Sequence, residues 1–147
     1  MKSGIAIISS VIGIVGGFIA TAFGGWSASL TTLLIFMTID YITGLMVAGI
    51  FNKSKKTSTG AIESKTCWKG LCRKGVTLLV VLVACRLDIL IDTTYLRDAT
   101  VIAFVVNECI SIIENAGLMG VPIPSVITKA IHVLKEKSDM DEDETEK

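Results

Sequence analysis

The chain has 147 residues, enough for one domain, and 51% of them are hydrophobic, with a mean hydropathy of +0.66. Four long apolar stretches lie along the chain. Fourteen basic and fourteen acidic residues cancel in number, but seven of the basic ones lie within residues 53–74 and six of the acidic ones within the last nine positions. This composition excludes an ordinary soluble domain and predicts an all-α polytopic membrane protein, with three to four transmembrane helices and a short C-terminal amphipathic helix.

The first apolar stretch, residues 4–23, contains no charged residue and is long enough to cross a hydrocarbon core of ~30 Å. It lacks a small-x-small cleavage site followed by a polar segment, so we expect it to be retained rather than removed as a signal peptide. Its glycines make it weakly hydrophobic toward its C-terminal end. The segment therefore either spans the membrane or lies in the interface.

Small residues recur on common faces of this segment and of the second apolar stretch, residues 30–51. In lipid, such rows let helix backbones approach closely. Association between subunits and packing within one subunit both remain open as explanations. The candidate oligomerisation residues are Gly13, Gly16, Gly17, Ala20, Gly24, Gly44 and Ala48.

A basic loop, residues 52–74, follows the second stretch. The positive-inside rule places this loop in the cytoplasm, where it would contact lipid headgroups. Because topology and anionic lipid explain its charge, no nucleic-acid partner is expected. The residues assigned to topology and headgroup contact are Lys53, Lys55, Lys56, Lys65, Lys69, Arg73 and Lys74.

Charged residues interrupt the second, third and fourth stretches, the last two of which cover residues 75–91 and 99–119. A helix rises ~1.5 Å per residue, which puts Asp40, Arg86 and Glu108 near the middle of the bilayer. A lone charge there costs at least ~2.5 kcal/mol, so such groups pair with one another or face water.

These polar groups have two interpretations. One is a polar surface that lines a pore or a water-filled subunit interface, and the other is an internal salt bridge of Arg86 with Asp40 or Glu108. The candidate intramembrane polar residues are Asp40, Arg86, Asp88, Asn107, Glu108, Ser111, Glu114 and Asn115.

The C-terminal region begins at two prolines, Pro122 and Pro124, which end the fourth span. Ser125 can cap a new helix over residues 125–137, with apolar residues on one face and lysines on the other. We predict a helix on the inner membrane surface or, alternatively, one that packs on its neighbours. Residues 138–147 are predicted to form a disordered acidic tail. With four spans, both termini lie in the cytoplasm.

The sequence carries no recognisable catalytic or metal-binding pattern. The only histidine is His132, far from the membrane stretches, and the four cysteines include no C-x-x-C pair. We therefore expect no enzymatic activity, no metal and no cofactor.

Four segments together resemble the toxin-secretion/phage-lysis holin family over roughly residues 30–135. They read LLIFMTIDYITGLMVAG (33–49), SKTCWKGLCRKG (64–75), LDILID (87–92) and NECISIIENAGLMGVPIP (107–124). The resemblance implies a homo-oligomer of the bacterial cytoplasmic membrane. Its lesions would release a cell-wall-degrading endolysin or, in clostridial-type toxin-release holins, large toxins.

Two other functions remain open. A small ion channel or transporter subunit would use Asp40 and Glu108 as a proton or cation site. A membrane anchor would use the basic loop or the acidic tail to recruit a soluble partner.

Overall fold

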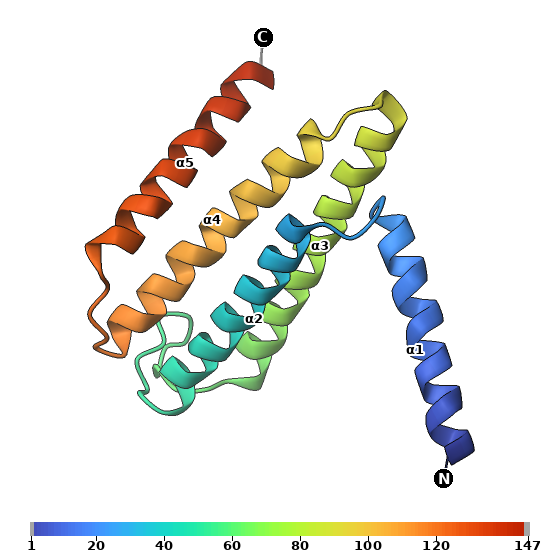
Figure 1. The fold of residues 1–147 in the computed structure, drawn as a ribbon. Helices are drawn as coiled ribbons and strands as arrows, with labels where there is room; N and C mark the ends of the chain where they lie inside the picture. The colour runs from blue at the N-terminus through green and yellow to red at the C-terminus, as the bar shows by residue number, and fades with distance from the viewer. Residues whose placement is uncertain (1, 146–147) are drawn as a thin grey trace.

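The computed structural model describes the backbone of residues 2–145 and the side chains of residues 3–137. Over the described backbone the chain is all-α, as predicted, with five helices and no strand (Figure 1). They are α1 (Lys2–Ala22), α2 (Ala28–Gly49), α3 (Ser64–Ile91), α4 (Tyr95–Leu118) and α5 (Ser125–Thr145).

Helices α2, α3 and α4 form a bundle with α4 at its centre. Helix α3 runs antiparallel to the other two (Figure 1). Helix α4 packs against α2, α3 and α5, and its contact with α2 is the most extensive in the described chain. Gly44 lies in this contact, where a Cβ would stand in ordinary van der Waals contact, 3.8 Å from Asn115 Nδ2. Helices α2 and α4 run in the same direction, so the chain returns to the starting end of the bundle through α3, which comes between them in the sequence (Figure 1).

The apolar core fills the half of the bundle nearer the α1–α2 and α3–α4 connections. Its side chains come from the beginning of α2, the later part of α3 and the beginning of α4. They are Leu30, Leu33, Met37, Val81, Cys85 and Val101. This cluster therefore packs one end of the bundle, whereas the other end combines buried apolar side chains, Val47 and Ala48, with buried polar ones.

Helix α1 stands apart from this bundle (Figure 1). None of its apolar window is buried, and a Cβ added at Gly13, Gly16 or Gly17 would meet nothing within 4 Å. Contact with the bundle begins after the helix, where a Cβ at Gly24 would lie 3.1 Å from Ile89 Cδ1. Among the described residues, Gly13, Gly16 and Gly17 of α1 thus have no neighbour outside their own helix, whereas Gly24 lies against Ile89 and Gly44 lies beside Asn115 of α4.

Three helices are long and apolar enough to cross a membrane: α1 over Ser3–Ala22, α2 and α4. Helix α3 is also long, but Lys74, Arg86 and Asp88 interrupt its apolar part. Because α2 and α4 run in the same direction, α3 has to run back along the bundle to connect them, whatever its own hydropathy.

The predicted basic loop was too long. Helix α3 begins at Ser64, so Lys65, Lys69, Arg73 and Lys74 lie on a helix, and residues 50–63 make the connection. This connection is folded on itself, since Ser54 N donates to the Gly60 carbonyl at 3.0 Å. Gly60 has a φ of +73°, and a Cβ there would collide with the Asn52 carbonyl. A side chain at residue 60 is therefore excluded without a change in the loop.

Helix α5 turns back at the end of α4 and runs antiparallel along it (Figure 1). Of the two predicted arrangements, the structure shows packing against a neighbouring helix. The helix continues to Thr145, beyond the predicted end at residue 137. Side chains from residue 138 onward lie outside the described part of the structure, so the acidic tail stays a prediction.

Candidate functional site

The central feature of the site is a lysine that joins two carboxylates from different helices. Lys74 Nζ on α3 donates to Asp40 Oδ2 on α2 at 2.8 Å and to Glu108 Oε2 on α4 at 2.6 Å. The exposed fractions of these side chains are 15% for Lys74, 9% for Asp40 and 13% for Glu108. The bridge therefore ties all three bundle helices together where water is largely excluded.

The depth of the bridge follows from helix geometry. At ~1.5 Å per residue, Asp40 lies ~18 Å from the start of α2 and Glu108 lies ~20 Å from the start of α4. Lys74 lies ~15 Å from the start of α3, which enters from the opposite end. Asp40 and Glu108 lie about halfway along their helices and Lys74 about a third of the way along α3, and the bridge brings all three groups to one level of the bundle.

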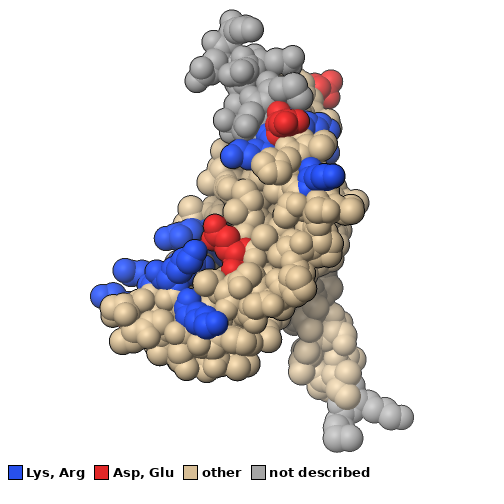
Figure 2. Space-filling model, turned by 90° about the vertical axis from the view of Figure 1, so that its left-hand side faces the viewer, with Lys and Arg blue, Asp and Glu red and all other residues tan. Residues whose placement is uncertain are grey.

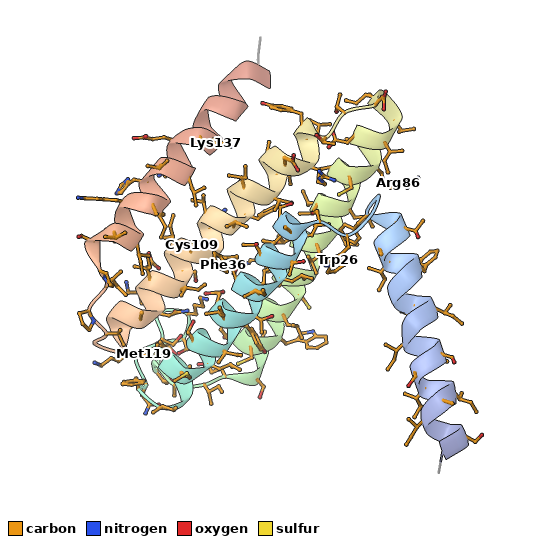
Figure 3. The ribbon with its side chains drawn as sticks, viewed as in Figure 1. Trp26, Phe36, Arg86, Cys109, Met119 and Lys137 are labelled. Atoms are coloured by element: carbon orange, nitrogen blue, oxygen red, sulfur yellow. The ribbon has the colours of Figure 1, made fainter. Side chains whose placement is uncertain are left out.

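Arg86 is not part of this bridge, although one of the two interpretations paired it with Asp40 or Glu108. It lies ~18 Å beyond Lys74 along α3, near the α3–α4 end of the bundle, and its side chain is exposed (Figure 3). The depth estimate for Arg86 was wrong because it counted from residue 75, whereas the helix begins at Ser64. Lys74, assigned from sequence to the cytoplasmic surface, occupies the central position instead.

Asn115 extends the polar network toward the loop end of the bundle. Its Nδ2 donates to Asp40 Oδ1 at 3.1 Å and to Thr43 Oγ1 at 3.0 Å. Thr43 Oγ1 in turn donates to the Asp40 carbonyl at 3.1 Å. Asp40 thus accepts hydrogen bonds from both α3 and α4, and among the described residues no buried side-chain nitrogen or oxygen lacks a partner.

A cavity of about 480 Å³ adjoins this network. Its walls come from α2, α3, α4 and the 50–63 connection. All five residues of the predicted polar side of α4 line the cavity. They are Asn107, Glu108, Ser111, Glu114 and Asn115. Asn107 and Glu114 are exposed, whereas Asn115 is buried. The structure therefore brings these five sequence-predicted residues together with Asp40 around one space.

Charges of both signs line the cavity. Its acidic lining residues are Asp40, Glu63, Glu108 and Glu114, and its basic ones are Lys55, Lys56, Arg73 and Lys74. Figure 2 shows basic side chains beside a smaller acidic group on the lower part of one face. Such a space can hold water and solvate carboxylates deep in the bundle, but no group of three potential metal ligands occurs among the described residues.

Asp88 is placed away from the cavity, at the α3–α4 connection. Its Oδ1 accepts from Thr93 Oγ1 at 2.6 Å and from Leu96 N at 3.1 Å, and its Oδ2 accepts from Arg97 N at 2.7 Å. These backbone groups belong to the first turn of α4, whose own N-cap residue, Thr94, makes no side-chain cap. Asp88 therefore acts as the N-terminal cap of α4 from the preceding helix.

Two residues of the network, Lys74 and Thr43, were not among the predicted intramembrane polar residues. A signal for Lys74 was present, since residues 64–75 contain no proline and Ser64 follows a turn-rich segment. Beginning the helix there places Lys74 at the depth of Asp40 and Glu108. Thr43 left no comparable signal, because a threonine in an apolar helix usually bonds to its own backbone.

Comparison with known proteins gives matches over most of the chain. A family model described as the bacteriophage holin family matches residues 17–136. A "probable holin" of Bacillus phage phi105 is 37% identical over 111 residues, which cover 75% of this chain and 76% of that protein. An uncharacterized protein of Clostridium perfringens is 36% identical over 138 residues, covering 91% of this chain and 96% of that protein. No solved structure matches the chain.

Proposed function

Because the chain belongs to the bacteriophage holin family, we propose that it oligomerises in the bacterial cytoplasmic membrane and forms lesions that release an endolysin, large toxins or both. The observation that best supports this proposal is the polar side of α4, which lies against a cavity inside a bundle of apolar helices. A surface of this kind is costly to expose to lipid but can line a shared aqueous opening.

In this proposal, the bridged bundle is the resting subunit. Lys74 satisfies Asp40 and Glu108 within one chain, so these two carboxylates stay covered, while Asn107 and Glu114 of α4 remain exposed beside the cavity. When subunits accumulate, α1 associates between chains through its unpartnered small residues, and α4 then turns its polar side toward a common opening. No enzymatic step is needed, because release follows from passage through the lesion.

The proposed topology has four spans, with both termini and the 50–63 connection in the cytoplasm. Support comes from the parallel course of α2 and α4, which requires α3 to return through the same layer. Lys53, Lys55 and Lys56 lie at the end assigned to the cytoplasm, as the positive-inside rule demands.

Co-expression with an endolysin in bacteria tests the function. We expect the chain alone to collapse the membrane potential without dissolving the wall, and cells to lyse only when both proteins are present.

Glu108→Gln and Asp40→Asn should each shift the time of lysis, because each leaves Lys74 with a single carboxylate. Lys69→Gln, at an exposed position of α3, is the matched control. Failure to depolarise or to permit lysis would overturn the holin proposal.

A small ion channel or transporter subunit is the second candidate, favoured by the carboxylates that border the cavity. Flux measurements on the purified chain in vesicles distinguish the two. Passage of a folded protein through the membrane supports the lesion, whereas saturable flux limited to small cations supports the channel.

A further inference from the structure

Helix α5 contacts α4 with only one edge of its apolar surface. Thr128, Ile131 and Leu134 are half-buried along this contact. Val126 and Val133 remain 73% and 64% exposed. Most of the apolar surface of α5 is therefore uncovered, although its residues have the spacing of a buried helix face.

Two lysines of α5 flank this apolar surface, one on each side, and Lys137 falls within its arc one turn after Val133. At ~100° per residue, the apolar side chains of residues 126–134 fall within an arc of ~160°. Lys129 and Lys135 fall just outside its two edges, while His132 and Glu136 lie on the opposite side. Lysines in this position extend their charged ends to lipid phosphates while their stems lie on apolar surface.

The position of α5 beside α4 is unfavourable inside a bilayer. The helix starts at the end of the bundle that carries the 50–63 connection and runs back toward the other end (Figure 1). Its described part carries exposed lysines and Glu136, which would enter the hydrocarbon. Figure 2, viewed from the side of α5, shows a second, upper group of basic side chains on this face, with acidic side chains among them.

The connection between α4 and α5 allows α5 to take another direction. Gly120 has a φ of +82°, which favours glycine, and Pro122 and Pro124 cannot continue the helical hydrogen bonding of α4. No continuous helix joins the two elements, so a rotation here does not require a helix to break.

We propose that in the membrane α5 leaves α4 and lies on the surface of a bilayer that contains anionic lipid, at the end of the bundle that carries the 50–63 connection. Val126, Ala130 and Val133 enter the acyl-chain boundary, and Lys129 and Lys135 contact phosphates. The occupant of the uncovered apolar surface is thus the lipid itself. This inference rests on membrane insertion and not on lesion formation.

Single-cysteine probes on the full chain test the position of α5. Cys67, Cys72 and Cys109 are changed to Ser and buried Cys85 to Ala, and a fluorophore is attached at Val133→Cys or, as the matched control, at His132→Cys. The protein is placed in phosphatidylcholine vesicles with or without phosphatidylglycerol. Iodide quenches from water, and lipid brominated near the headgroup end of its acyl chain quenches from the boundary.

With phosphatidylglycerol present, we expect the brominated lipid to quench the residue-133 probe several-fold more than the residue-132 probe, and iodide to show the reverse order. Lys129→Glu together with Lys135→Glu should abolish the lipid quenching at residue 133, while the double change to Arg should retain it. Equal iodide quenching of both probes would overturn the proposal, because α5 would then lie in water. Shielding of both probes from iodide would also overturn it, because α5 would then be inserted beside α4.

Lysis with a co-expressed endolysin is measured separately on the same variants. A surface-bound α5 in a protein that fails to support lysis would overturn the proposed function alone. Lysis by a protein whose α5 stays on α4 would overturn this inference alone.

Discussion

Lys74 is the residue on which the polar half of the bundle depends. It is one cation between two carboxylates, each from a different helix, and all three side chains are shielded from water. Two carboxylates at this depth repel each other without a cation between them, and their burial makes an unpaired charge costly. A neutral residue of similar length in place of Lys74 is therefore expected to show how much the charge of the lysine contributes to stability.

Replacing Lys74 by Met should lower the free energy of unfolding by about 2–4 kcal/mol, because it leaves Asp40 and Glu108 without a counter-charge. Thermal unfolding of the detergent-solubilised protein, followed by circular dichroism, measures this loss. Lys69→Met, at an exposed position of the same helix, should change stability by less than about 0.5 kcal/mol.

Neutralising the carboxylates provides the matching rescue. When Asp40→Asn and Glu108→Gln accompany Lys74→Met, no buried charge is left unpaired, so much of the lost stability should return. If the triple variant were no more stable than Lys74→Met alone, the lysine would act through packing and not through its charge.

Asp88 has a structural role that is independent of the cavity. Replacing it by Ala should destabilise the protein by about 1–2 kcal/mol, since Leu96 N and Arg97 N in the first turn of α4 lose the carboxylate that accepts their hydrogen bonds. Asp92→Asn is the control, because Asn tolerates the φ of +56° at that position. Thermal unfolding of both variants, with lysis timing alongside, separates the cap from the proposed pore surface. Equal loss of stability in both variants would contradict the capping role.

At the scale of elements, small residues serve two different contacts. Those of α2 lie against α4 within the chain, where Asn115 stands 3.8 Å from a Cβ placed at Gly44. In α1, a Cβ added at Gly13, Gly16 or Gly17 would meet nothing within 4 Å among the described residues. The same sequence pattern therefore lies in a helix contact in α2 and faces open space at these three glycines of α1.

Gly44→Leu and Gly17→Leu should consequently give opposite results. The first adds volume between α2 and α4 and should lower the thermal stability of the monomer by about 1–3 kcal/mol. The second should leave monomer stability unchanged but reduce the oligomer fraction, measured by light scattering in detergent and by crosslinking in membranes. Loss of monomer stability in Gly17→Leu, with oligomers intact, would show that α1 packs on its own bundle.

On the scale of the whole molecule, the bundle is divided into two halves. An apolar core holds the end near the α3–α4 connection, and the bridge and cavity occupy the end near the 50–63 connection. Separation of the helices at the polar end exposes groups that water can solvate, whereas separation at the apolar end exposes core side chains. The polar end is therefore where the bundle is expected to open.

This division gives a prediction about orientation. In the cysteine-free background, a membrane-impermeant maleimide should label Thr94→Cys in intact cells and Lys55→Cys only after the membrane is permeabilised. Both positions are exposed, and Thr94 makes no side-chain cap, so the changes should leave the fold intact. The reverse labelling pattern would refute the proposed cytoplasmic position of the 50–63 connection.

The sequence by itself determined the fold class, the family and the polar side of α4. Long apolar stretches and the helical spacing of Asn107, Ser111 and Asn115 are local properties, and they survive errors of several residues in where a helix begins. The matched family region, residues 17–136, contains the four segments on which the resemblance was recognised.

Only the tertiary structure decided which cation meets the carboxylates, which small residues remain free and where α5 lies. Pairing depends on the relative shift of three helices, and moving the start of α3 from residue 75 to Ser64 replaces Arg86 by Lys74 at the level of Asp40. A depth counted along one helix carries an error of ~1.5 Å per misplaced residue, while a salt bridge tolerates less than one residue of error. Contacts between helices therefore had to come from their packing, because no single segment contains the register that sets them.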